Sequence, residues 1–195
     1  MRGLEALPIS LSGETPAEHM PFITASRNLS ESFAAETGAN RIPGLVSTDG
    51  RIASQFLQAA SAYVDKPRPR FCEWGSGLGS VTCLAACMGW AATGIEIEPR
   101  LVSAARKLAA RHHIPASFYR CSYKPSAMFD ASAAMTDFDT GHGFGLFDFD
   151  LVYAYFWPAE RDVMTDAFAR HAHDGTILLR YAGGVTCEAF RIVRT

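Results

Sequence analysis

The sequence predicts an α/β fold in which a doubly wound, mostly parallel sheet lies between two layers of helices. Short apolar segments, typical of buried strands, alternate along the chain with segments whose apolar residues recur at helical spacing. Glycine and proline clusters separate these segments where turns are needed. With 195 residues, the chain can form one such domain with a full core.

The first part of the chain, residues 1–46, is predicted to be a helical or irregular arm of the same domain, because prolines are spread through it. A helix is expected near 29–37, where Gly38 closes it. Residues 47–195 are predicted to form the ligand-binding domain. It opens with a helix whose cap is Ser47, Thr48 or Asp49, and the proline-rich connector 66–70 ends this helix.

Strands and helices then alternate. Strands are expected at 70–74, 91–97, 116–121, 148–156, 176–181 and 188–193, and helices at 79–88, 99–112 and 158–175. The segment 122–147 is ambiguous and is expected to hold one helix and then a glycine-rich loop. Ligands of such sheets bind beyond the carboxyl ends of the strands, where the winding reverses.

The composition favours a soluble protein without a charged macromolecular partner. The formal net charge is -2 and the pI is about 6.3, which gives no clear signal for nucleic acid or membrane binding, although a local basic patch stays open. The five cysteines are mostly in apolar segments and predict reduced, buried thiols in the cytoplasm. Cys83 and Cys87 lie one helical turn apart without a second ligand pair, so no metal site is expected. The oligomeric state is not predicted.

A glycine-rich bend follows the strand 70–74. Three alternate glycines, Gly75, Gly77 and Gly79, permit a tight turn and let a ligand touch the backbone. Free amide groups there and at the following helix N-terminus favour a carboxylate, while Glu73 is suited to an ammonium group. A ligand that carries both groups is an amino acid, such as the methionine end of S-adenosylmethionine (SAM).

A second acidic residue, Glu96, stands at the end of the next strand, about 20 residues further on. At this place and distance a carboxylate can accept hydrogen bonds from a ribose hydroxyl pair. Glu98 is the weaker candidate, because it precedes Pro99 and favours the helix N-terminus.

The segments 71–79 and 92–99 together resemble the class I SAM-dependent methyltransferases, which have a Rossmann-like fold. The resemblance implies SAM as the cofactor and transfer of its methyl group as the reaction. It implies the SAM loop for Glu73, Gly75, Ser76, Gly77 and Gly79, and the ribose-binding acid for Glu96. The expected cofactor site is completed by three further residues, Ile97, Ser122 and Tyr153. The segment 148–155 resembles the family's fourth strand, and 45–51 the segment that lies over the cofactor.

The sequence departs from this family in two places. Cys121, Ser122 and Tyr123 follow the third strand where an acidic adenine contact is common, so Ser122 is expected to hydrogen-bond and Tyr123 to stack on the adenine. Too few residues follow Tyr181 for the family's usual final helix and two strands. The C-terminal sheet edge is therefore expected to be shortened, and a partner is one way to cover it.

The methyl acceptor is not identified by the sequence, and a small molecule or a protein side chain is favoured. The sequence lacks the (Asn/Asp)-Pro-Pro-aromatic motif of many methyltransferases that act on adenine or glutamine. It also lacks the Pro-Cys pair of enzymes that methylate cytosine at C5. Tyr153, Tyr155 and Trp157 alternate along one strand and either belong to the core or wall an acceptor pocket. The catalytic candidates are Tyr155, Trp157 and His142, the last on a glycine-rich loop. Glu160 is expected to cap the next helix, with an acceptor-side role as the alternative.

Two other functions compete with methyl transfer. A non-catalytic SAM-binding or scaffold domain would keep the same motifs. An NAD-dependent oxidoreductase would need the G-x-G-x-x-G fingerprint, but Ser80 stands where its third glycine belongs.

Overall fold

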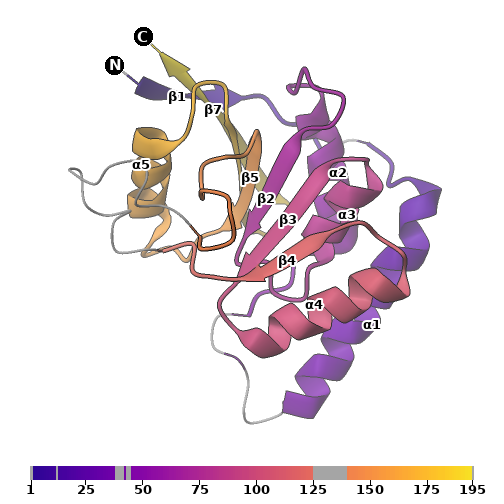
Figure 1. The fold of residues 1–195 in the computed structure, drawn as a ribbon. Helices are drawn as coiled ribbons and strands as arrows, with labels where there is room; N and C mark the ends of the chain where they lie inside the picture. Colours follow the sequence, from indigo (N-terminus) through magenta and orange to yellow (C-terminus); the bar gives the residue numbers. More distant parts are fainter. Residues whose placement is uncertain (1, 12, 38–41, 43–44, 125–139, 195) are drawn as a thin grey trace.

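The computed structural model describes residues 2–11, 13–37, 42, 45–124 and 140–194. Its strands form one seven-stranded sheet in the order β1-β7-β6-β5-β2-β3-β4 (Figure 1). The strands are β1 Arg2–Leu7, β2 Arg70–Trp74, β3 Ala91–Glu96, β4 Ser117–Arg120, β5 Leu151–Tyr155, β6 Ile177–Gly183 and β7 Thr186–Arg194. Strands β2 to β6 pair in parallel. The chain winds outward from β2 through β3 to β4, and from β5 to β6 in the opposite direction. The predicted doubly wound fold is confirmed, and its winding reverses between β2 and β5.

The helices of the described residues are η1 Ala17–His19, α1 Met20–Thr37, α2 Gly50–Ser61, α3 Ser80–Cys87, α4 Pro99–Arg111 and α5 Arg161–His171. The Asp49 carboxylate accepts hydrogen bonds from the amides of Arg51 and Ile52, which identifies the α2 cap. α1 begins at Met20, earlier than predicted. Pro21 does not prevent this, because the first turn of a helix needs no intrahelical N–H donors.

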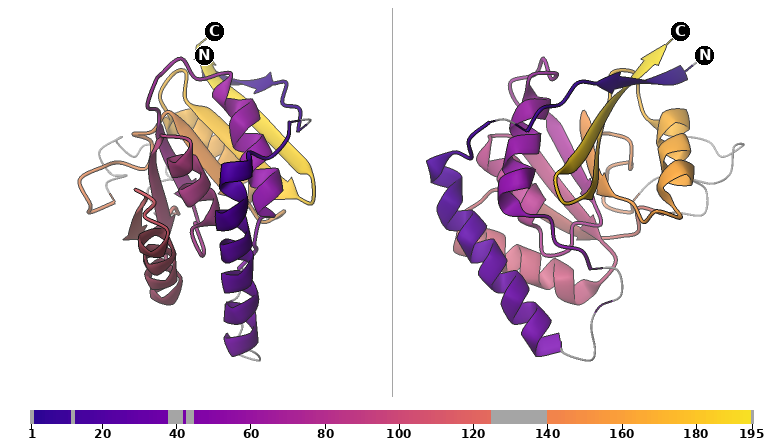
Figure 2. Two further views of the ribbon diagram at one scale, coloured as in Figure 1. Left: turned by 90° about the vertical axis from the view of Figure 1, so that its right-hand side faces the viewer. Right: turned by 180° about the vertical axis from the view of Figure 1, so that it is seen from behind.

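Helices cover both faces of the sheet and divide the core into two parts. Helices α2, α3 and α4 pack against one face, where residues such as Phe56, Leu84 and Ala105 meet Phe71 and Leu179 of the sheet. α5 and the segment 144–149 pack against the other face. α1 lies on the outside of the first helical layer (Figure 2), against α2. The three-layer arrangement is therefore the predicted one.

The first residues of the chain form a strand, whereas the sequence predicted a helical or irregular arm there. Strand β7 runs antiparallel to β6, and β1 runs antiparallel to β7, from Arg2 opposite Arg194 to Leu7 opposite Ala189. Strand β1 therefore has the same direction as β6. Strand β1 thus forms the edge of the sheet next to β7 (Figures 1 and 2), where the sequence analysis expected a shortened edge.

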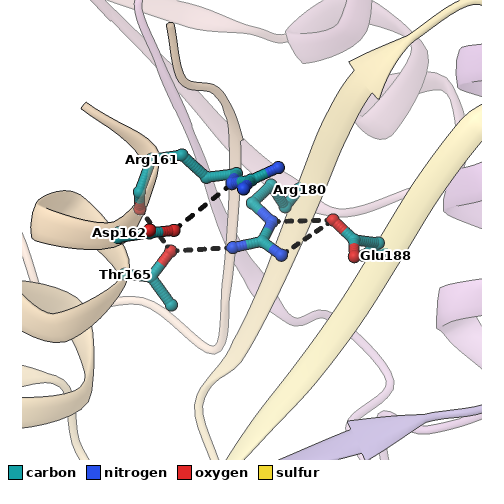
Figure 3. Close-up of polar contacts among 5 residues, drawn as sticks. All are labelled: Arg161, Asp162, Thr165, Arg180 and Glu188. Carbon is teal, nitrogen blue, oxygen red and sulfur yellow. Dashed lines mark hydrogen bonds and ion pairs between the residues drawn. The ribbon is translucent and has the colours of Figure 1, made fainter. Parts of the chain in front are cut away.

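A half-buried arginine ties α5 to this side of the sheet. Arg180 of β6 donates to Glu188 of β7 over 2.8 and 2.9 Å, and to the Thr165 hydroxyl of α5 over 2.9 Å (Figure 3). The Thr165 hydroxyl in turn donates to the carbonyl oxygen of Arg161. These bonds fix the first turn of α5 relative to β6 and β7.

All five cysteines are free thiols, but only Cys72 and Cys83 are buried. Cys87 is exposed and Cys121 and Cys187 are half-buried, so the prediction of burial is wrong for Cys87. The apolar residues around Cys87 belong to the buried side of α3, and Cys87 lies at its end. Within the described ranges, no helix combines the length and the apolar character needed to cross a membrane.

Deletion of residues 2–7 is expected to destabilise the protein and to promote self-association. It removes the β1–β7 ladder and exposes the edge of the nine-residue strand β7, and unpaired edges add further strands. Urea unfolding and light scattering measure both effects. Glu5→Gln is the control, because it preserves the ladder. A deletion variant that stays monomeric and keeps its unfolding midpoint would contradict the role given to β1.

Candidate functional site

A cleft of about 440 Å³ opens at the carboxyl ends of β2, β3 and β5, where the winding of the sheet reverses. Seven of the sequence-predicted site residues line it, namely Gly75, Gly77, Glu96, Ile97, Ser122, Tyr155 and Trp157. Tyr123, expected to contact adenine, also lines the cleft. Most of the predicted site is thus brought together at the place that the fold assigns to a ligand.

The glycine bend after β2 is held by backbone hydrogen bonds to β3. The amides of Gly75 and Ser76 both donate to the carbonyl oxygen of Ile95 over 2.9 Å. Gly75, Gly77 and Gly79 have φ angles of +72°, +53° and +80°, which favour glycine. A Cβ on Gly77 would lie 3.2 Å from Leu45, so a side chain there would press on the segment above the bend.

Gly79 has a packing role and is not among the residues that line the cleft. It caps α3, and a Cβ at this position would lie 2.6 Å from the Phe118 ring and 2.8 Å from Ala105. Such distances are far below normal contact, so Gly79 lets α3 and α4 approach the sheet. Its predicted cofactor contact stays a prediction, and the structure adds this packing role.

Glu96 faces the glycine bend. One carboxylate oxygen accepts a hydrogen bond from the Gly77 amide over 3.0 Å, and the other accepts from the Glu98 amide over 2.9 Å. Both oxygens keep a further lone pair, because a carboxylate oxygen can accept two hydrogen bonds. Glu96 is therefore fixed at the lip of the cleft and can still accept hydrogen bonds from a ligand. Glu98, by contrast, accepts from the Arg100 amide and caps α4.

Glu73 faces the interior instead of the cleft. One of its oxygens accepts hydrogen bonds from the amide and the hydroxyl of Thr82, which joins the end of β2 to α3. Burial raises the pKa of Glu73 to about 8, against the opposing effect of the Thr82 hydrogen bonds. A carboxyl group that is protonated at pH 7 offers no full negative charge to an ammonium group. The expected contact of Glu73 with a ligand ammonium is therefore not supported by this geometry.

Tyr153 and Ser76 are buried and are not among the residues that line the cleft. The Tyr153 ring packs at 6.1 Å from Phe56 of α2, and its hydroxyl lies 3.1 Å from the Thr48 hydroxyl. As β5 is a central strand, Tyr153 belongs to the core between the sheet and α2, and this position gives no support to its predicted cofactor contact. The Ser76 side chain has no hydrogen-bond partner among the described residues.

Aromatic side chains form much of the cleft wall. Tyr123 stacks on Trp74 with ring centroids 6.1 Å apart and an angle of 10° between the rings. Tyr155 and Trp157 meet edge to face at 5.7 Å. Trp157 is 41% exposed. Tyr155 and Trp157 thus form part of the cleft wall, as one of the two interpretations of the sequence predicted, whereas Tyr153 belongs to the core.

An ion pair crosses one end of the cleft. Lys124, just after β4, lies 2.6 Å from the Glu160 carboxylate at the start of α5. Glu160 occupies the N-cap position of α5, as expected, but its side chain makes no capping hydrogen bond. The sequence analysis missed Lys124, since no local pattern marks a lysine whose partner lies far along the chain.

His142 lies apart from the residues that line the cleft. Its ring packs 4.9 Å from that of Tyr119, and its Nε2 lies 3.3 Å from the carbonyl oxygen of Arg120. This position beside β4 does not favour His142 as a catalytic base.

The segment 45–51 was expected to lie over the cofactor. Leu45 and Val46 line the cleft, while Thr48 contacts Tyr153 and Asp49 caps α2. The segment 125–139 lies outside the described residues.

Gly79→Ala is expected to destabilise the fold by about 2 kcal/mol or more, because it combines left-handed backbone strain with a steric clash. The matched control is Gly89→Ala, since Gly89 has a φ of +83° but an added Cβ there would meet no atom within 4 Å. Strain alone should cost this control about 1 kcal/mol. Equal losses in urea unfolding would contradict the packing role of Gly79.

Glu73→Gln is expected to flatten the pH dependence of stability. The folded state holds the Glu73 proton up to a pKa of about 8, whereas the unfolded state releases it near 4.5. The stabilising contribution is complete below pH 4.5 and is lost as the pH rises to 8. The wild-type melting temperature should therefore fall more steeply than that of the variant between about pH 5 and 8.5. Parallel curves would show that Glu73 ionises normally.

Comparison with known proteins yields similar folds only. No protein-family model matches the chain, and no curated protein sequence matches it. An RNA methyltransferase from Salinibacter ruber, solved with S-adenosyl-L-homocysteine, matches with a TM-score of 0.55 at 20% identity over 75% of this chain and 92% of that chain.

Two further structures match with a TM-score of 0.52 at 15% identity. The cofactor-bound protein Rv0187 from MTB matches over 82% of this chain and 64% of its own length. A hypothetical protein of Thermus thermophilus matches over 80% of this chain and 91% of its own length. Some other similar structures are longer, and this chain spans only about half of them. The chain thus has the Rossmann-like fold that is found in class I methyltransferases.

Proposed function

We propose that the chain binds SAM and transfers its methyl group to an acceptor. The observation that carries the proposal is the position of Glu96, whose carboxylate is fixed by the Gly77 and Glu98 amides at the lip of the cleft. A carboxylate in this place beside an open glycine bend fits the ribose hydroxyls of a nucleoside. The fold shared with the S-adenosyl-L-homocysteine-bound methyltransferase supports the same interpretation.

The residues of the cleft fit the parts of SAM. The volume of about 440 Å³ is within the range that holds cofactors. The backbone at Gly75 and Gly77 offers close approach to the amino-acid end, and Glu96 accepts from the ribose. Tyr123 and Ile97 provide apolar surfaces for the adenine, and Ser122 a hydrogen-bonding group.

SAM, when bound, supplies an activated methyl group on a sulfonium. The protein then has to align the acceptor and to exclude water. Leu45 and Val46 cover the bend from above, and Trp74, Tyr155 and Trp157 wall the cleft with aromatic surface. These side chains limit the access of water to the reacting atoms.

The alternatives receive less support. In an NAD-binding enzyme a third glycine would allow close packing of the helix on the strand, but Ser80 opens α3 here. A scaffold domain has no need for a carboxylate held at an open cleft. For the acceptor we favour a small molecule or a protein side chain, because the similarity to the RNA methyltransferase extends to the fold alone.

Calorimetry with SAM, S-adenosylhomocysteine and NAD tests the proposal. We expect micromolar binding of the two adenosyl ligands and none of NAD. Glu96→Gln should weaken SAM binding about tenfold, because it weakens charge-assisted hydrogen bonds. Asp162→Asn, which removes an exposed charge on α5, should leave SAM binding unchanged. Binding of NAD but not of SAM would overturn the proposal.

A further inference from the structure

We propose that the end of the cleft between Tyr155, Trp157 and Glu160 binds the methyl acceptor as an amine. The inference rests on the proposed function, since it places the acceptor beside the cofactor. It extends that function by naming the chemical class of the acceptor.

The Glu160 carboxylate has one oxygen in use and one oxygen free. The first oxygen accepts from the Lys124 ammonium group at 2.6 Å. The second has no contact with solvent and no hydrogen-bond partner within the part of the chain that the structure describes. A desolvated carboxylate oxygen without a donor is costly. An acceptor amine that enters the cleft brings N–H donors and a positive charge to this oxygen.

The charges of the cleft also favour a cation. Glu96, Glu98 and Glu160 line it, and Lys124 is the one basic side chain among its described lining residues. Burial lowers the pKa of Lys124, but the interactions with Glu160 and Tyr123 outweigh this effect and raise the pKa above its usual value. Lys124 therefore remains charged and stays paired with Glu160. The cleft therefore has an excess of negative charge, which favours an ammonium group over a neutral or anionic acceptor at the Glu160 end.

Aromatic rings beside Glu160 provide the second element of cation recognition. Tyr155 and Trp157 meet edge to face and line the cleft together with Glu160. The Glu160 amide donates to the Trp157 carbonyl oxygen over 2.8 Å, which joins the acid to the ring-bearing segment. Aromatic faces combined with a carboxylate are a common means of binding an ammonium group.

The position of Glu160 is fixed by the sheet. α5 starts directly after it, and Arg180 holds Thr165 of that helix against β6 and β7 (Figure 3). The Thr165 hydroxyl donates to the carbonyl oxygen of Arg161, the residue that follows Glu160. The acid is thus held in place before a ligand binds, which lowers the entropic cost of binding.

The proposed step is balanced without a further reactant. An ammonium acceptor first gives one proton to the free Glu160 oxygen. The nitrogen lone pair then forms the N–C bond, and the C–S bond breaks with its electron pair going to sulfur. The products are a methylated ammonium ion and S-adenosylhomocysteine, and Glu160 passes its proton to solvent.

Tryptophan fluorescence of the S-adenosylhomocysteine-loaded protein tests the inference. Trp157 is 41% exposed, whereas Trp74 and Trp90 are buried, so Trp157 should report on a ligand at this end of the cleft. The probes are benzylamine, benzyl alcohol and benzoate near neutral pH, which differ mainly in charge. We expect saturable binding of benzylamine, at least tenfold tighter than that of the other two. Trp157→Phe should remove most of the signal, and a residual change would come from Trp74, which also lines the cleft.

A pair of variants separates Glu160 from general charge effects. Glu160→Gln should weaken benzylamine binding about tenfold and leave binding of S-adenosylhomocysteine unchanged. Asp162→Asn removes the same charge two residues away, where the side chain is 86% exposed, and should change benzylamine affinity less than twofold. Thermal unfolding of both variants verifies that they are folded.

Three results would overturn the inference. They are equal or tighter binding of benzyl alcohol or benzoate, the absence of saturation with benzylamine, and an unchanged affinity in Glu160→Gln. The same protein titrated with S-adenosylhomocysteine distinguishes the two proposals. Nucleoside binding without amine binding rejects only this inference, whereas amine binding to a protein that ignores the nucleoside rejects the proposed function and, with it, the role of the amine as methyl acceptor.

Discussion

The site depends on one constraint, which is that hydrogen bonds to acidic side chains on two adjacent strands hold the glycine bend after β2 and the helix that follows it. Glu73 anchors α3, the helix that follows the bend, through Thr82, and Glu96 holds the bend itself from the cleft through Gly77. Between them, the amides of Gly75 and Ser76 share the carbonyl oxygen of Ile95. The bend is therefore rigid, although its glycines have large conformational freedom in the unfolded chain.

The two acidic residues have similar surroundings in sequence but different roles. Glu73 lies within β2, where side chains meet the helical layer, and burial keeps its pKa high. Glu96 ends β3, so its side chain reaches the lip where the strands stop. The rest of the cleft is organised around this lip, with aromatic rings from the ends of β2 and β5 and an ion pair that joins the exits of β4 and β5. α5 carries one half of that pair and is secured by Arg180.

Much of this arrangement could be predicted from the sequence. The alternation of apolar strands and amphipathic helices gave the boundaries of β2, β3 and α4 nearly to the residue, because each pattern is local. The placement of Gly75, Gly77 and Glu96 at the cleft followed from the rule that ligands bind at the carboxyl ends of parallel strands.

β1 could not be predicted, because its pairing with β7 joins the two ends of the chain and six residues carry little pattern. The ion pair of Lys124 with Glu160 was missed for the same reason. The direction of Glu73 and the core position of Tyr153 depend on which face of each strand the helices cover, which the sequence leaves open.

The most direct test of the account is a crystal structure of the protein with S-adenosylhomocysteine. The account predicts that the ribose hydroxyls lie within hydrogen-bonding distance of the Glu96 carboxylate and that the amino-acid end lies on the bend at Gly75 and Gly77. A ligand bound instead in the cavity of about 860 Å³ between α1 and α4, or a ribose that does not touch Glu96, would contradict it.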